Sequence, residues 1–157
     1  YSPVIEAPYI IGKEKSVRLM QAESLFDSLP EDQKPGALYF QELLKNVQSV
    51  EVDAVFSEDE TCMDGVKIID TPGHMLGHVS LYVPESQTLI AADALVIEHG
   101  EFEIANPAFT LDLEAAVESV KKLKSLEIKR MICYHGGATE ERIEAKLARL
   151  ILRYCTP

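Results

Sequence analysis

One segment, from Val66 to Val96, constrains the fold more than any other part of the chain. It opens with a short apolar run that a Thr-Pro-Gly turn over 71–73 ends abruptly. Proline there removes a backbone donor, and glycine adopts dihedral angles that other residues avoid. Alternating apolar and polar residues follow over 79–83, and then a nearly wholly apolar run. We therefore predict consecutive strands over 66–70, 79–83 and 88–96, joined by tight turns.

Three residues with metal-binding chemistry lie at or near the ends of predicted strands. His74 directly follows the Thr-Pro-Gly turn, and Asp93 is the acid within the last apolar run. A carboxylate in such a strand is costly unless it is paired or bound to a metal. His135 follows a β-rich segment, Ile128–Tyr134, and precedes a Gly-Gly turn. Imidazole and carboxylate groups are ligands that a divalent ion such as Zn²⁺ prefers, so these residues are candidate ligands.

The letters around these residues form a longer pattern. TPGHxxGHxxLY begins at Thr71, an Ala-Asp pair follows in the next apolar run, and Tyr-His-Gly-Gly begins at Tyr134. This pattern resembles the metallo-β-lactamase superfamily, and within it the glyoxalase II-like and lactonase-like hydrolases. The resemblance extends over essentially the whole chain but corresponds only to the second half of the family's domain. It implies an α/β fold: the second half of an αββα sandwich, with a mixed β-sheet and covering helices.

The resemblance also implies roles for the candidate residues. His74, Asp93 and His135 match metal ligands of the family. Asp93 matches the acid that bridges two divalent ions, so it is also the candidate catalytic residue. The ions are expected to be zinc, two in a complete site, and the implied activity is hydrolysis of a small-molecule carboxylic ester, thioester or lactone. Two ions about 3.5–4 Å apart acidify a water and stabilise the negative charge that develops on the carbonyl oxygen.

Three neighbouring residues keep alternative interpretations. His78 is expected to stabilise the turn after the first predicted ligand, with metal contact as the lesser alternative. His99 lies either in an ordinary loop or near the site. Tyr134 either packs in the core or points its hydroxyl group toward a substrate.

The family's HxHxDH signature is absent, and no histidine precedes His74. In the family that signature supplies most ligands of the first ion and some of the second. We therefore expect residues 1–157 to form a single domain that is the C-terminal part of a larger metallo-β-lactamase-fold domain, incomplete and inactive alone. Its expected partners are the missing N-terminal half or a second copy in a dimer. The alternative is a non-catalytic half-domain or interaction module with weak or no metal binding.

Composition argues against several other classes of function. The net charge is −11, whereas binding to a nucleic-acid backbone needs clustered Lys and Arg, so we expect no nucleic-acid partner. No apolar run approaches the ~20 residues that span a bilayer, and no signal peptide opens the chain, so we expect no membrane association. The scattered cysteines Cys62, Cys133 and Cys155 have no CxxC spacing and indicate reduced thiols in a cytoplasmic protein.

The rest of the chain predicts helices and short strands. Apolar residues at helical spacing predict helices over 15–29, over 37–47, from Thr110 or Asp112 to Leu126, and over 139–154. Short strands and turns are expected at Val4–Ile5 and 51–56 (strands), 57–61 (an acidic turn), 61–63 (a strand) and 64–65 (a hairpin turn). Tyr39 and Phe40, in the second helix, either belong to the core or form a wall of a substrate site.

Overall fold

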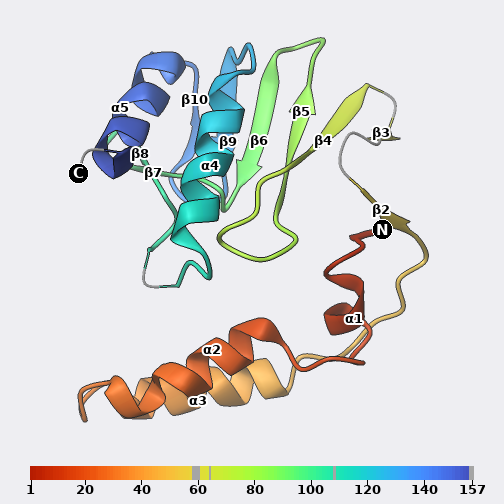
Figure 1. Cartoon of the computed structure of the whole chain (residues 1–157), viewed down its shortest axis with the longest axis vertical. Helices are drawn as coiled ribbons and strands as arrows, with labels where there is room; N and C mark the ends of the chain where they lie inside the picture. The colour runs from red at the N-terminus through yellow and green to blue at the C-terminus, as the bar shows by residue number, and fades with distance from the viewer. Residues whose placement is uncertain (58–60, 64, 108, 156–157) are drawn as a thin grey trace. The chain divides into compact units, whose positions relative to one another are not determined.

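The structure, a computed structural model, describes residues 1–57, 61–63, 65–107 and 109–155, except for the side chains of 61–63 and 155. The chain divides into two compact units, Tyr1–Val55 and Phe56–Pro157 (Figure 1). All the candidate ligands lie in the second unit. The expectation that the chain is one domain, itself part of a larger one, stays a prediction.

The first unit is built around a hairpin of two helices. In chain order it contains β1 (Ser2–Pro3), α1 (Ala7–Ile10), α2 (Val17–Leu25), the 3₁₀ helix η1 (Phe26–Ser28), α3 (Lys34–Lys45) and the beginning of β2 (Val55–Phe56). Ser16 caps α2 by accepting a hydrogen bond from the Leu19 N–H. Pro35 lies in the first turn of α3, where its missing N–H costs nothing, so this helix begins earlier than predicted. The predicted strand at Val4–Ile5 is wrong, because these residues lie in a turn after β1.

The aromatic residues of α3 do not form the predicted core. α3 turns Gln41 toward α2, and its Nε2 donates a 3.0 Å hydrogen bond to Ala22 O. Gln41 is 6% exposed, whereas Tyr39 is 68% and Phe40 is 40% exposed. The interpretation of these aromatics as core is therefore wrong, because α2 covers the Gln41 side of α3 rather than the aromatic side. Their alternative role, as a wall of a substrate site, stays a prediction.

The second unit is organised around a mixed six-stranded sheet with the strand order β10-β9-β6-β5-β4-β3. Its strands are β3 (Thr61–Met63), β4 (Val66–Asp70), β5 (Val79–Val83), β6 (Thr88–Ala92), β9 (Arg130–Cys133) and β10 (Gly137–Thr139). Neighbouring strands are antiparallel except β6 and β9, which run parallel. The predicted strands over 61–63, 66–70 and 79–83 are confirmed, whereas only the end of the strand predicted over 51–56 forms, as β2.

The strand predicted over 88–96 is wrong in its second half. β6 ends at Ala92, and the Ala94 N–H donates to Ala91 O at 3.0 Å, so the chain turns directly after the sheet. It then enters β7 (Val96–Glu98), which pairs with β8 (Glu101–Glu103) in a separate two-stranded sheet. The residues that follow, Ala94, Leu95 and Val96, are buried, which explains why the apolar run continues past the strand end. Asp93 consequently lies just beyond the end of β6.

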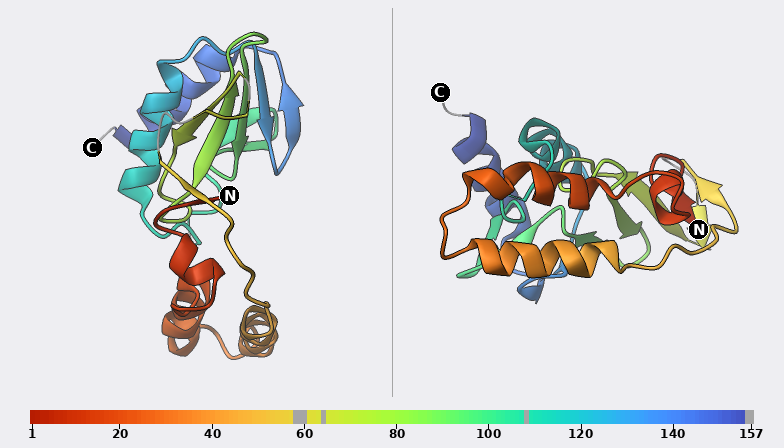
Figure 2. Two further views of the ribbon diagram at one scale, coloured as in Figure 1. Left: turned by 90° about the vertical axis from the view of Figure 1, so that its right-hand side faces the viewer. Right: turned by 90° about the horizontal axis from the view of Figure 1, so that it is seen from below.

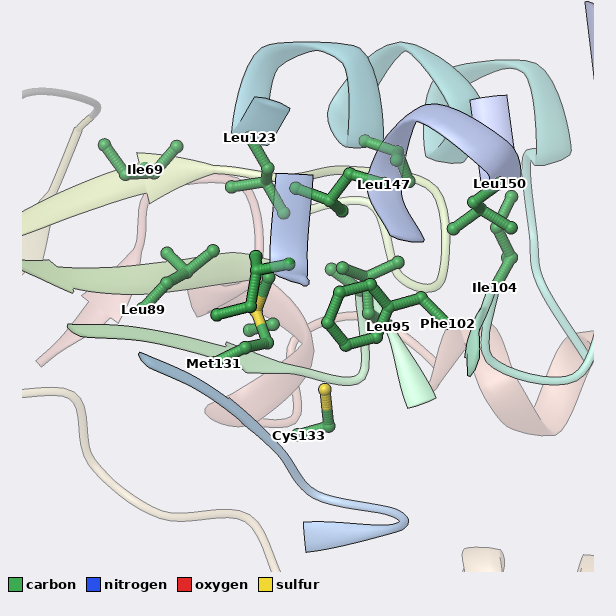
Figure 3. Packing of buried hydrophobic residues seen from close by; sticks show 14 of the residues in the cluster. Ile69, Leu89, Leu95, Phe102, Ile104, Leu123, Met131, Cys133, Leu147 and Leu150 are labelled. Atoms are coloured by element: carbon green, nitrogen blue, oxygen red, sulfur yellow. The ribbon is translucent and has the colours of Figure 1, made fainter. Parts of the chain in front are cut away.

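Two helices, α4 (Leu113–Lys124) and α5 (Ile143–Cys155), cover one face of this sheet (Figure 2). The side chain of Asp112, one of the two helix starts that the sequence allows, caps α4 by accepting a 2.9 Å hydrogen bond from the Ala115 N–H. Side chains of the helices and of this sheet face form one core (Figure 3). It includes Ile69, Tyr82, Leu89, Ala91, Met131 and Cys133 from the sheet, and Ala116, Val120, Leu123, Ile143, Leu147 and Leu150 from the helices. The predicted α/β class, a mixed sheet with covering helices, is confirmed.

The opposite face of the sheet carries a continuous apolar row. The strand register places Ile68 beside Leu81, Leu81 beside Ile90, and Ile90 beside Ile132. These residues lie outside the core that α4 and α5 form with the sheet. Ile68 is buried and the other members of the row are half-buried. A sheet that is apolar on both faces is typical of an inner layer of a fold.

No helix in the described ranges is long and apolar enough to cross a membrane. The acidic turn predicted over 57–61 and the hairpin turn predicted at 64–65 fall partly on residues outside those ranges. Among the cysteines, Cys133 is a buried free thiol, and the side chains of Cys62 and Cys155 are not among those described.

Candidate metal-binding site

His74 follows a turn that packs tightly against α4. The preceding residue, Gly73, has a φ of +134°, and a Cβ atom added there would lie 2.4 Å from the Ala116 N atom. Only glycine therefore allows this turn to approach the helix so closely. The contact is reinforced by Ser119 of α4, whose Oγ donates a 2.7 Å hydrogen bond to Pro72 O. Helix α4 thus fixes the backbone that delivers His74 to the end of β4.

Hydrogen bonds connect His78 to Thr71, which precedes His74, and to the backbone of Asp93. Its Nδ1 lies 2.9 Å from Thr71 Oγ1 and 3.1 Å from Thr71 O, and its Nε2 accepts a 3.2 Å hydrogen bond from the Asp93 N–H. Burial lowers the pKa of His78 below its usual value, and the neighbouring His74 lowers it further. The ring is therefore neutral at neutral pH. These bonds give His78 the structural role that the sequence led us to expect.

Asp93 follows a backbone position of unusual geometry. Ala92 has a φ of +50°, which residues other than glycine rarely adopt. The pairing of β6 with β9 also shifts register between Ile90 and Ala92, so the strand is irregular just before the acid. The Oδ1 atom of Asp93 is buried and accepts no hydrogen bond from the described part of the chain. A buried carboxylate oxygen in this condition is costly unless a cation or a donor satisfies it.

His135 reaches Asp93 from the end of β9. The Tyr134 N–H donates to Ala92 O at 3.1 Å, and the Ile97 N–H donates to His135 O at 3.0 Å, so the backbone on both sides of Asp93 holds this loop. His135 Nε2 lies 3.5 Å from Asp93 Oδ1. The His135 side chain is 75% exposed and that of Asp93 is 26% exposed, so the pair opens to solvent on the histidine side.

The structure thus brings two of the three candidate ligands, Asp93 and His135, into direct proximity. The third, His74, has a buried Nδ1 atom, and its ring centroid lies 6.3 Å from that of His78. Among the described residues, no group of three or more His, Cys, Asp or Glu side chains could hold a metal ion by itself. The ligand atoms present, a carboxylate oxygen beside an imidazole nitrogen, fit part of a metal site. The assignment of all three as ligands stays a prediction.

The other residues with alternative interpretations are exposed. His99 lies in the turn between β7 and β8, with a φ of +50°. Tyr134 is exposed, so its placement in the core is wrong, and contact with a substrate stays a prediction.

Cys133 is buried beside the site, and burial together with the charge of Asp93 raises the pKa of its thiol to about 12. It is therefore an inert packing residue.

Sequence reasoning missed two buried hydroxyl groups, those of Thr71 and Ser80. Their Oγ atoms lie 3.0 Å apart, and Ser80 Oγ also donates to Ala91 O at 3.3 Å. The available signal was a serine at a position of β5 that shares a sheet face with core residues. Because the apolar members of 79–83 alternate with Ser80 and Tyr82, the pattern suggested the opposite face as the buried one.

The family model of the Metallo-beta-lactamase superfamily matches residues 7–135. The chain belongs to this superfamily. The probable metallo-hydrolase YflN of Bacillus subtilis (strain 168) is 29% identical to this superfamily member over an alignment of 147 residues, which covers 83% of this chain and 52% of YflN. The N-acyl homoserine lactonase AiiA of Bacillus thuringiensis subsp. kurstaki is 32% identical over an alignment of 91 residues, which covers 55% of this chain and 36% of AiiA. The chain therefore spans about half the length of YflN, and less of AiiA.

Solved structures of metallo-β-lactamase proteins share the fold. A metallo-β-lactamase family protein of Thermus thermophilus superimposes with a TM-score of 0.67 at 19% identity, over 98% of this chain and 52% of that protein. An archaeal superfamily protein of Sulfolobus tokodaii superimposes with a TM-score of 0.57 at 20% identity, over 90% of this chain and 57% of that protein. The predicted superfamily and the predicted fold class are both confirmed.

Proposed function

We propose that this superfamily member contributes to the site of a metal-dependent hydrolase. In this site His74, Asp93 and His135 bind divalent ions, and the proposed metal is zinc. The observation that carries the proposal is the buried Oδ1 atom of Asp93, which accepts no hydrogen bond within the described chain and lies 3.5 Å from His135 Nε2. The family membership and the name of YflN, a probable metallo-hydrolase, support hydrolysis as the reaction.

The residues of this chain bind and orient in this proposal. A divalent ion, when bound, acidifies a water and stabilises the negative charge that develops on a carbonyl oxygen. Asp93 is the proposed bridging and catalytic residue, because its carboxylate is the acidic donor beside a candidate imidazole ligand. His135 approaches from the solvent side, while the turn at Gly73 and its contact with α4 hold the backbone of His74 in place.

The proposed substrate is a small-molecule carboxylic ester, thioester or lactone. All three present a carbonyl carbon that a water attacks with departure of an oxygen or sulfur leaving group. The identity shared with AiiA, an N-acyl homoserine lactonase, supports the lactone among them.

The proposed site is completed by a further layer of the fold. The HxHxDH signature is absent from this sequence, and the described residues do not hold a three-ligand cluster of their own. The apolar row from Ile68 to Ile132 lies on the sheet face opposite α4 and α5, where a second layer would pack. We propose that an N-terminal half-domain, or failing that a second copy of the chain, covers this face. The competing function is a non-catalytic half-domain, which the same test distinguishes.

The test measures metal binding and turnover separately. The metal-free chain is titrated with Zn²⁺ in parental form, as Asp93→Asn, and as His99→Gln, an exposed turn histidine that serves as a control. We expect the parent and the control to bind at most about one equivalent weakly, because two histidines and one carboxylate leave coordination positions open. Asp93→Asn should bind less. Two tightly held ions in the parent would contradict the incomplete site.

Turnover is then measured on a panel of lactones, thioesters and aryl esters. The chain alone should be inactive. Joined to a segment with the HxHxDH signature, in one reading frame or as a second polypeptide, it should hydrolyse a member of the panel in a chelator-sensitive way. Chelator-insensitive turnover, or full activity of a folded Asp93→Ala variant, would refute the hydrolase assignment. A complete but inactive assembly would support the non-catalytic alternative.

A further inference from the structure

A continuous path of hydrogen bonds runs from Asp93 back to Ala91 through side chains of the neighbouring turn and strand. The Asp93 N–H donates to His78 Nε2 at 3.2 Å, and His78 Nδ1 lies 2.9 Å from Thr71 Oγ1. Thr71 Oγ1 lies 3.0 Å from Ser80 Oγ, which donates to Ala91 O at 3.3 Å. The path therefore begins and ends on the same short stretch of backbone, on either side of a single residue.

The two ends of this path fix the direction of every bond in it. The Asp93 N–H can only donate, and Ala91 O can only accept. His78 Nε2 must therefore be the unprotonated nitrogen, and Nδ1 must carry the proton. Thr71 O, a pure acceptor, lies 3.1 Å from Nδ1 and requires the same tautomer. The Thr71 hydroxyl then donates to Ser80, whose hydroxyl donates to Ala91.

The residue enclosed by this path is Ala92, whose φ is +50°. An alanine released from its surroundings returns to negative φ, because its Cβ atom collides with the backbone in the left-handed region. Such a change at Ala92 would turn the next residue, Asp93, relative to β6. The hydroxyl groups of Thr71 and Ser80 are buried and His78 is half-buried, so breaking a bond between them leaves a buried polar group without its partner. The path thus holds a strained backbone in place.

We propose that His78 is a positioning residue for Asp93. Its Nε2 atom holds the Asp93 N–H, keeps Ala92 at positive φ, and so keeps the Asp93 carboxylate beside His135. This positioning role applies to the metal-free chain. Only its consequence for metal binding rests on the proposed function. If His78 only stabilised the turn after Thr71, loss of the hydrogen bond at Nδ1 would perturb the chain, and loss of the hydrogen bond at Nε2 would not.

Two substitutions separate the two nitrogen atoms. His78→Gln places an amide oxygen near the position of Nε2, where it can accept from the Asp93 N–H, but it loses the donor to Thr71. His78→Asn places an amide nitrogen near the position of Nδ1, where it can donate to Thr71, but it is too short to reach Asp93. His99→Gln is the matched control, because His99 is exposed in the β7–β8 turn.

The first readout is amide hydrogen exchange at Asp93 in the metal-free chain. We expect His78→Asn to accelerate exchange of the Asp93 N–H by about tenfold or more, because the bond that protects it is lost. His78→Gln and the control should stay within about threefold of the parent. Equal rates in the two His78 variants, or faster exchange in His78→Gln, would overturn the proposal.

A second readout needs no substitution. Nitrogen-15 NMR of the parental chain should show His78 as the neutral tautomer with the proton on Nδ1 and a lone pair on Nε2. A proton on Nε2 would overturn the proposal even if neither variant folds, since that nitrogen could not accept from the Asp93 N–H.

Zn²⁺ affinity, measured by competition with a chromophoric chelator, tests the consequence for the site. His78→Asn should weaken binding about tenfold, whereas His78→Gln should retain it, a rescue that a role confined to the turn would not give. If Asp93→Asn leaves Zn²⁺ affinity unchanged, the proposed metal role of Asp93 fails. The hydrogen-exchange comparison still decides the role of His78 in that event.

Discussion

Gly136 and Gly137 offer a sharp test of how the His135 loop is built. Both have positive φ, +88° and +84°, but their surroundings differ. A Cβ atom at Gly136 would lie 2.1 Å from Ile97 O, whereas a Cβ atom at Gly137 would meet nothing within 4 Å. The two alanine substitutions thus share a backbone penalty, and only one adds a collision. Their comparison isolates the energy of the close approach between the loop and β7.

The shared penalty is the cost of a positive φ for alanine, about 1–2 kcal/mol. At Gly136 the colliding atom is a backbone oxygen, so a side-chain rotation cannot relieve the clash, which adds about 1–3 kcal/mol. If the loop moved away from β7 to relieve the clash, it would stretch the 3.0 Å hydrogen bond from the Ile97 N–H to His135 O. We therefore expect Gly136→Ala to destabilise by roughly 2–5 kcal/mol and Gly137→Ala by roughly 1–2 kcal/mol.

Urea unfolding followed by circular dichroism measures this difference in free energy. In thermal unfolding, a chain of this size should show it as a fall in Tm of about 2–4 °C per kcal/mol. Hydrogen exchange at the Ile97 N–H adds a local readout, because that amide should lose protection in Gly136→Ala alone. Equal destabilisation by the two substitutions would refute the reasoning, since it would mean that β7 can move away from the loop without cost.

Two further predictions concern the turn before His74 and the thiol beside Asp93. Ser119→Ala removes the hydrogen bond to Pro72 O and should destabilise by about 1–3 kcal/mol, because it leaves a carbonyl oxygen without its donor. Ser125→Ala, at the exposed C-cap of the same helix, removes a 2.7 Å hydrogen bond to Lys122 O that water can replace, so it should cost within about 0.5 kcal/mol. Equal costs would contradict the first expectation. Folding stability should fall as pH rises above 9, because the unfolded Cys133 thiol ionises there while the folded thiol keeps its proton up to about 12. Correspondingly, mass-spectrometric mapping should find Cys133 alkylated slowly at pH 8 until urea is added, and rapid labelling of the folded chain would refute this.

Local chemistry made much of the second unit predictable. The strands over 66–70 and 79–83 agree with β4 and β5, because alternation and the Thr-Pro-Gly turn are properties of the neighbouring residues alone. The start of α4 was narrowed to Thr110 or Asp112 for the same reason, and Asp112 is the cap. The strand over 88–96 was predicted wrongly because the residues 94–96 that follow the end of β6 are also buried, and composition does not distinguish buried residues beyond a turn from a buried strand.

Long-range contacts account for what the sequence did not reveal. Helical spacing located α3, but it could not show that α2 would cover Gln41 and leave Tyr39 exposed. In the site, the placement of candidate ligands at strand ends was predictable, and Asp93 and His135 do meet. The hydroxyl groups of Thr71 and Ser80 were missed because their partners come from different strands.

Each candidate ligand adjoins a backbone position with positive φ. The positions are Gly73 at +134° before His74, Ala92 at +50° before Asp93, and Gly136 at +88° after His135. Side chains on a strand alternate between two faces, so bringing several of them to one point beyond a sheet requires the backbone to leave strand geometry abruptly. Glycine makes such a turn without a steric penalty, whereas alanine does not. The strain is therefore left at Ala92, the one non-glycine of the three, and that is where the path through His78 holds the chain. In the proposed site, the support that His78 gives to Asp93 is therefore required along with the acid itself.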